Sequence, residues 1–237
     1  HAMFNWRMLC LKGEAKYADI MELVLYNSAL SGISIDGTHY FYANPLRMNH
    51  GARDYSSTES ATREPYIECF CCPPNLVRTI AKLSGWAYSL SENGIAVNLY
   101  GGNELTTQML DGSSIQLIQE TQYPWDGAVK ITVQECQKKP FEMMLRIPEW
   151  AGGTKILLNG KEAGVEAEPG TDARIKRVWN KGDVVELDMP MEIRLLEGHP
   201  RIEEVRNQVA IKRGPVVYCV ESPDLPDNTG ILDVYLP

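Results

Sequence analysis

Residues 91–100 read SENGIAVNLY, and the character of the chain changes within this stretch. Before Gly94, apolar residues recur at the spacing of about 3.6 residues that is typical of α-helices. After Gly94, short alternating or β-branched runs are separated by turn residues, a pattern typical of β-strands. We therefore expect an α+β protein with a helical domain over residues 1–93 and a β-sandwich domain over residues 94–237.

The first of these domains contains three expected helices. The first helix covers residues 2–10 and ends at the break Lys12-Gly13-Glu14. The second covers residues 15–30 and is apolar on most sides, as is typical of a helix packed between other elements. The third runs from about Pro74 to Leu90, and its prolines fit a first turn, where their missing N–H would be unpaired anyway.

The second domain contains about ten to twelve strand candidates, separated by turns such as Asn159-Gly160. Many short strands at this spacing predict an antiparallel sandwich. The clearest candidates cover residues 95–100, 114–120, 129–134, 141–147, 155–158, 174–179, 184–189, 208–212 and 216–220.

Composition excludes two classes of partner. The chain has 237 residues, 44% of them hydrophobic, and a formal net charge of −8. An acidic chain lacks the basic surface of a nucleic-acid binder, and no polybasic segment or apolar run of about 20 residues predicts a membrane partner. Six cysteines in a chain of this length do not predict a disulfide framework. Oligomeric state stays open, as does localisation between cytoplasm and periplasm.

The strongest local signal is Cys69-Phe70-Cys71-Cys72-Pro73-Pro74-Asn75. A thiolate is the form of cysteine that attacks carbon and binds metal, and a place at a helix start favours that form. Zinc usually takes four ligands, and the chain alone does not complete such a set. The alternative interpretation is a pair of buried apolar cysteines.

Three further residues are candidates for contacts with a substrate. Glu22 lies in an otherwise apolar helix, where burying it without a partner would be costly. Tyr40 lies in an aromatic run that suits a short strand, and His50 lies in the long polar stretch that follows. Polar connections of that length are often functional.

Two tryptophans lie beside turns in the second domain. Trp125 belongs to Tyr123-Pro124-Trp125-Asp126-Gly127, and Trp179 precedes a predicted hairpin turn. Aromatic faces stack on sugar rings, so a carbohydrate contact is one interpretation. We favour a core tryptophan that anchors a turn at both positions.

Together these motifs resemble glycoside hydrolase family 127, the β-L-arabinofuranosidases, over essentially the whole chain. The resemblance is carried by CCPPNLVR at 71–78, FYANPL at 41–46 and YPWDG at 123–127, and it extends through WRML at 6–9, GEAKYAD at 13–19, ELVLYN at 22–27, SGISIDG at 31–37, LRIPEWA at 145–151, RVWNKGD at 177–183 and KRGPVVYCVE at 212–221. It implies that residues 1–93 are the last part of an (α/α)6 toroid and that a β-sandwich follows, incomplete at its C-terminal end.

The same resemblance implies a retaining hydrolase whose nucleophile is a zinc-bound cysteine. Cys71 would be the nucleophile, and Cys71 and Cys72 would be two of the zinc ligands. The thiolate would attack the anomeric carbon and form a thioglycosyl intermediate that water releases. The other ligands and the acid–base glutamate of the family would fall before His1. We therefore expect a fragment without an acid–base residue, and inactive on its own.

Three function classes follow from these observations. The leading one is the zinc-thiolate hydrolase, acting on an L-arabinofuranoside-containing glycan of plant origin. The second is a non-catalytic carbohydrate-binding or structural β-sandwich module, which would bind sugar through Trp125 or Trp179 and give Cys71 no role. The third, a thiol redox or zinc-storage protein, is weakened because the strand-rich half lacks thioredoxin-like alternation of strands and helices.

Overall fold

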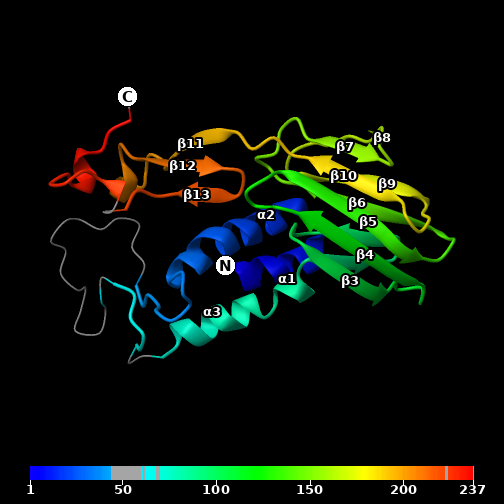
Figure 1. The fold of residues 1–237 in the computed structure, drawn as a ribbon, viewed down its shortest axis with the longest axis horizontal. Coiled ribbons are helices and arrows are strands. Elements are labelled where there is room, and N and C mark those ends of the chain that lie inside the picture. Colours follow the sequence, from blue (N-terminus) through cyan, green and yellow to red (C-terminus); the bar gives the residue numbers. More distant parts are fainter. Residues whose placement is uncertain (44–59, 61, 68–69, 222–223, 237) are drawn as a thin grey trace. The chain divides into compact units, whose positions relative to one another are not determined.

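The computed structural model of the chain describes all residues except 44–59, 61, 68–69, 222–223 and 237. These residues form two compact units (Figure 1). Unit 1 contains residues 1–23, 82–193 and 213–215. Unit 2 contains residues 24–81, 194–212 and 216–237. In the described part of the chain, no helix is long and apolar enough to cross a membrane.

The first two helices follow the predicted boundaries closely at their start. Helix α1 covers Ala2–Lys12 and ends at Gly13, whose φ of 63° is the left-handed conformation that glycine adopts at helix ends. Helix α2 covers Ala15–Leu23 and continues as a π-helix over Val24–Ala29 and a 3-10 turn over Leu30–Gly32. The predicted second helix is therefore helical throughout but changes its winding after Leu23.

The predicted third helix is wrong in its second half. Helix α3 covers Cys72–Ile80, a 3-10 turn covers Leu83–Gly85, and strand β1 covers Tyr88–Ser91. β1 forms an antiparallel hairpin with β2, Gly94–Val97, around the turn Glu92-Asn93. Pairing with β2 therefore decides the structure of this segment, although the spacing of Leu83 and Ala87 also fits a helix.

Two sheets make up most of unit 1. The four-stranded sheet has the order β1-β2-β6-β9, with β6 at Pro140–Ile147 and β9 at Thr171–Val178. The six-stranded sheet has the order β3-β4-β5-β10-β7-β8, and its strands cover Asn103–Gln108, Ser114–Thr121, Ala128–Cys136, Val184–Asp188, Lys155–Leu158 and Lys161–Glu162, respectively. The α+β class predicted from the sequence is thus confirmed.

One pair of strands departs from the predicted antiparallel arrangement. β2 and β6 run parallel, with Gly94 opposite Glu142 and Val97 opposite Leu145. The chain leaves β2, builds β3 to β5 in the other sheet, and returns to lie beside β2. A crossover of this kind gives a parallel pair, whereas a tight hairpin gives an antiparallel one.

The core of unit 1 lies between its two sheets. Apolar residues of both sheets are buried, among them Ile131 and Leu117 of the six-stranded sheet and Met143 of the four-stranded one. Gln119 of β4 donates to the Tyr88 hydroxyl of β1 at 2.7 Å, so a hydrogen bond joins the two sheets. Helix α2 contacts β9 of the four-stranded sheet.

A third sheet has the order β11-β12-β13, covering Ile193–Glu197, Val209–Arg213 and Val216–Tyr218. Except for Ile193 and Arg213 it belongs to unit 2. The strands that the sequence did not predict are β1, β3, β8 and β11. β3 and β8 are edge strands with many exposed residues, so their sequences lack the apolar alternation that the prediction relied on.

Candidate functional site

The adjacent cysteines lie where α3 begins. Cys71 is the N-cap residue, and Cys72 is the first helical residue. Their sulfur atoms are 3.6 Å apart, with Cys71 exposed and Cys72 half-buried. The structure thus confirms that a helix starts at the cysteine pair, and Cys71 is exposed in this chain rather than buried as an apolar residue.

The first turn of α3 offers fewer donors to a thiolate than most helix starts. Pro73 and Pro74 carry no N–H, and the Asn75 N–H already donates to the Cys71 carbonyl at 3.1 Å. A helix start normally leaves four N–H groups unpaired. Stabilisation of a Cys71 thiolate by backbone hydrogen bonds is therefore smaller than its position at a helix start suggested.

The Tyr40–Tyr42 segment lies beside the cysteine pair. The Cys72 sulfur is 4.0 Å from the carbonyl oxygen of Tyr42. Two backbone hydrogen bonds of 2.9 Å join Tyr40 and Glu64, and the Tyr40 hydroxyl donates to the Gly37 carbonyl at 3.1 Å. The substrate contact expected of Tyr40 stays a prediction. His50 lies outside the described residues, so its expected contact stays a prediction too.

The donor chemistry of the cysteine pair fits part of a zinc site. Two sulfurs bound to one tetrahedral zinc ion lie about 3.8 Å apart, given a Zn–S distance of about 2.3 Å. The 3.6 Å between the two sulfurs here is close to that separation. In the part of the chain that the structure describes, no group of three or more His, Cys, Asp and Glu side chains is placed to hold a metal. The pair therefore offers two sulfur donors, whereas zinc usually takes four ligands.

Glu22 lies in a buried polar cluster of unit 1. Its carboxylate accepts hydrogen bonds from the Arg146 guanidinium and the Tyr123 hydroxyl, both at 2.5 Å, and from the Trp150 indole N–H at 3.3 Å. Only 2% of Glu22 and 1% of Arg146 is exposed. Arg146 is thus the charged partner that a buried Glu22 needs. The expected contact of Glu22 with a substrate stays a prediction.

Asp19 completes this cluster from the preceding turn of α2. Its carboxylate accepts a hydrogen bond from Arg146 at 2.5 Å and another from the Glu149 backbone N–H at 3.2 Å. Burial raises the pKa of Asp19, and the Arg146 guanidinium opposes that rise. Arg146 of β6 therefore links this strand to α2, because its guanidinium pairs with both Asp19 and Glu22.

The two tryptophans beside turns differ sharply. Trp179 is fully buried, stacks on Phe141 and donates its indole N–H to the Phe141 carbonyl at 3.1 Å, which confirms its interpretation as a core residue. Trp125 is 65% exposed, so its interpretation as a core anchor is wrong. Tyr123, two residues earlier, is the buried anchor of that turn.

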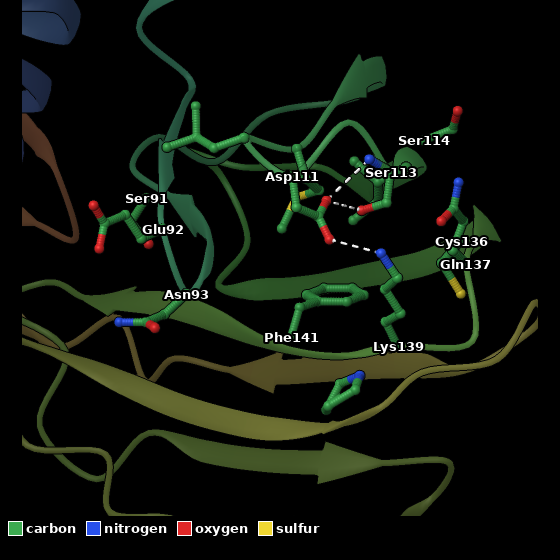
Figure 2. Close-up of a pocket in the computed structure, with 14 residues that line it drawn as sticks. Ser91, Glu92, Asn93, Asp111, Ser113, Ser114, Cys136, Gln137, Lys139 and Phe141 are labelled. Atoms are coloured by element: carbon green, nitrogen blue, oxygen red, sulfur yellow. Dashed lines mark hydrogen bonds and ion pairs between the residues drawn. The ribbon is translucent and has the colours of Figure 1, made fainter.

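A small pocket lies at one end of unit 1, where Asp111, Lys139, Cys136 and Phe141 meet (Figure 2). Its volume of about 50 Å³ suits a few water molecules and is too small for a sugar ring. The Cys136 thiol donates to the Trp179 carbonyl at 3.3 Å. We assign this pocket no function.

Comparison with known proteins identifies the family. The model of the β-L-arabinofuranosidase catalytic domain of family GH127 matches residues 1–85, that of the GH127 middle domain matches residues 94–191, and that of the family's C-terminal domain matches residues 193–237. The chain belongs to glycoside hydrolase family 127. The cysteine pair and Glu22 lie in the catalytic-domain match, and Trp125 and Arg146 lie in the middle-domain match.

Individual glycoside hydrolases are similar to this protein over nearly the whole chain. A non-reducing end β-L-arabinofuranosidase of Bifidobacterium longum is 33% identical over 235 residues, which are 96% of this chain and 35% of the relative. A solved glycoside hydrolase superposes with a TM-score of 0.89 at 50% identity, over 95% of this chain and 37% of the other. A GH127 β-L-arabinofuranosidase from Geobacillus stearothermophilus T6 gives a TM-score of 0.81 at 36% identity, over 91% of this chain and 34% of the other.

The chain therefore spans about a third of the length of these three relatives. The division predicted between residues 1–93 and 94–237 stays a prediction. Arg146 was absent from the candidates named from single residues, although it carries the buried cluster. Its signal is an arginine inside the apolar run Met143-Met144-Leu145-Arg146-Ile147, where a charged side chain needs a buried partner.

Proposed function

We propose that this chain carries the cysteine nucleophile of a retaining β-L-arabinofuranosidase. The observation that supports the proposal most strongly is the adjacent thiol pair at the start of α3, within the match to the GH127 catalytic domain. We propose further that residues 1–93 form the last part of an (α/α)6 toroid. The substrate would be a glycan that ends in β-L-arabinofuranose, as the name of the Bifidobacterium relative indicates for that enzyme.

Within the pair, Cys71 is the better nucleophile candidate. Its side chain is exposed, whereas Cys72 is half-buried with its sulfur 4.0 Å from the Tyr42 carbonyl. A nucleophile must reach the anomeric carbon of a bound sugar, and exposed Cys71 meets this need. Cys72 would hold a metal beside it.

In this mechanism the Cys71 thiolate attacks the anomeric carbon. A C–S bond forms while the glycosidic C–O bond breaks, and an acid outside this chain protonates the leaving oxygen. Water then gives a proton to that same group and attacks the same carbon, the C–S bond breaks, and the sugar leaves with retained configuration. Zinc, held by Cys71, Cys72 and ligands outside this chain, would keep the thiols deprotonated near neutral pH.

The decisive experiment compares two cysteine variants of the full-length enzyme. Cys71→Ser should lower kcat by about 10³-fold or more, because a serine hydroxyl at its ordinary pKa is a far weaker nucleophile. Cys10→Ser, at an exposed cysteine of α1, is the matched control and should keep wild-type turnover. Circular dichroism should show both variants folded. Wild-type turnover in Cys71→Ser would refute the nucleophile assignment.

A further inference from the structure

An exposed tryptophan lies at the turn between β4 and β5. Trp125 is 65% exposed, although tryptophan is the largest apolar side chain and contributes strongly to stability when buried. Scattered exposed apolar residues are normal, but an exposed aromatic side chain on a fixed turn beside a groove is typical of a binding site. Whether Trp125 belongs to a binding site therefore depends on the order of its turn and on the groove beside it.

Hydrogen bonds fix both the N–H group and the carbonyl group of the Trp125 backbone. Its N–H donates to the Gln122 carbonyl at 2.9 Å, and its carbonyl accepts from the Arg213 guanidinium at 3.1 Å. Asp126 accepts a hydrogen bond from the Ala128 N–H at 2.7 Å. The indole is thus presented on an ordered turn, and little backbone entropy is lost when a ligand binds.

Buried contacts of Tyr123 also fix this turn to the core of unit 1. Tyr123 is buried, its hydroxyl donates to Glu22 at 2.5 Å, and its ring stacks on Trp150 with centroids 6.3 Å apart. Tyr123 points into the core, whereas Trp125 is open to solvent. Tyr123 therefore anchors this turn, and most of the Trp125 side chain is left accessible to a ligand.

A groove of about 510 Å³ lies next to this turn, over the outer face of the six-stranded sheet. Gln122 and Asp126, which flank Trp125 in the chain, both line it. Strand register places Lys130 of β5 opposite Glu120 of β4 and Glu186 of β10, and Asp188 opposite Lys155 of β7. The floor of the groove therefore alternates carboxylates with ammonium groups.

This lining selects a neutral polyhydroxylated ligand. Carboxylates accept hydrogen bonds from sugar hydroxyls, lysines donate to them, and an amide side chain does both. Four carboxylates against two lysines repel a polyanion such as a nucleic acid. The charged floor also disfavours an apolar peptide or a lipid tail, because its ions would lose hydration without compensation.

We propose that Trp125 and this groove form a non-catalytic binding site for an oligosaccharide chain. A sugar ring would stack on the indole while the next residues lie over Lys130 and Glu186. The site lies in the middle-domain match and needs no part of the cysteine pair. It would hold the glycan on the enzyme independently of the step at Cys71.

The test is calorimetric titration of the 237-residue chain with soluble arabinan and with short arabino-oligosaccharides. Trp125→Ala should weaken binding by about tenfold or more, as truncating an aromatic hot spot does. Trp125→Tyr keeps a stacking face and should restore binding to within a few-fold of wild type. Phe4→Ala removes an equally exposed aromatic side chain from α1, 66% exposed, and should bind as wild type does.

A second variant tests the groove separately. Glu186→Gln keeps the shape of the side chain and removes its charge, so arabinan binding should weaken while the fold is kept. Equal affinity of wild type and Trp125→Ala, or no binding of either probe by wild type, would overturn the proposal. A dimer that Trp125→Ala dissociates would assign the indole to a protein contact and overturn it as well. Loss of turnover in Cys71→Ser bears only on the catalytic proposal.

Discussion

The Arg146 guanidinium is buried and pairs with two carboxylates. It reaches Glu22 and Asp19 on α2 and donates through its Nε to the Asn98 carbonyl at 2.6 Å. The sequence predicted that Glu22 needs a partner if buried, because an unpaired buried carboxylate is costly. It did not name that partner, since 124 residues separate Glu22 from Arg146 and only the tertiary fold brings them together.

Removing one member of this pair should be far more costly than removing a surface pair. Glu22→Ala leaves a buried guanidinium with one carboxylate fewer and should lower the free energy of unfolding by about 3–5 kcal/mol. The control is Arg174→Ala, which breaks the exposed ion pair with Glu142 at 3.1 Å and should cost less than about 1 kcal/mol. Urea unfolding measures both. Equal losses in the two variants would contradict this account.

Asp183 allows a pH prediction at the same scale. Burial acts to raise its pKa, but hydrogen bonds from the Asn159 amide and the Asn180 N–H, both at 2.9 Å, outweigh burial and leave the pKa lowered. A carboxyl with a lowered folded pKa contributes stability that is present above its unfolded pKa of about 3.9. That stability is lost as the pH falls through the folded pKa.

Asp183→Ala should therefore destabilise the protein at pH 7 and much less in acid. We expect a loss of about 1–3 kcal/mol at pH 7, because the Asn159 and Asn180 donors lose their acceptor. The difference from wild type should shrink as the pH is lowered from 4 to 2. Urea titrations across this range provide the measurement, and a difference that is constant with pH would refute the stated cause.

Strand pairing explains which elements the sequence predicted and which it did not. Strands β4, β5, β6 and β7 were predicted within two residues at each end, because their buried positions alternate with exposed ones or form continuous apolar runs. β1 was taken for helix, and the parallel pairing of β2 with β6 was not foreseen. Both depend on a partner strand, which local spacing does not reveal.

The parallel pairing of β2 with β6 leaves no room for a side chain at position 94. A Cβ atom at this position would collide with the carbonyl oxygen of Glu142, its neighbour on β6. Gly94→Ala should lower the free energy of unfolding by about 1–3 kcal/mol, because the paired backbones must shift apart. Gly101→Ala is the matched control, since a Cβ there meets nothing within 4 Å. Thermal unfolding compares the two, and equal stability would argue against the observed register.

At the scale of the whole molecule, the cysteine pair and the large sheets belong to different units. Cys71 and Cys72 lie in unit 2, whereas both large sheets and the Arg146 cluster lie in unit 1. The core of unit 1 is apolar, and a hydrogen bond between the Gln119 and Tyr88 side chains joins its two sheets. In the sequence the cysteine motif was the clearest signal of chemistry, while the alternating runs were the clearest signal of the fold. The structure assigns these two signals to separate parts of the chain.

Metal removal should therefore change thiol reactivity without unfolding the sheets. In the zinc-loaded protein, alkylation of Cys71 and Cys72 should be slow and should accelerate once a chelator is added, because metal-bound thiolates are shielded from the reagent. The exposed cysteines Cys10 and Cys219 are internal controls whose alkylation should not respond to chelation. The thermal unfolding midpoint of the β-rich unit should stay unchanged, since its core is built from apolar side chains and buried ion pairs. Loss of sheet structure on chelation would show that the metal supports the fold itself, as in small zinc domains.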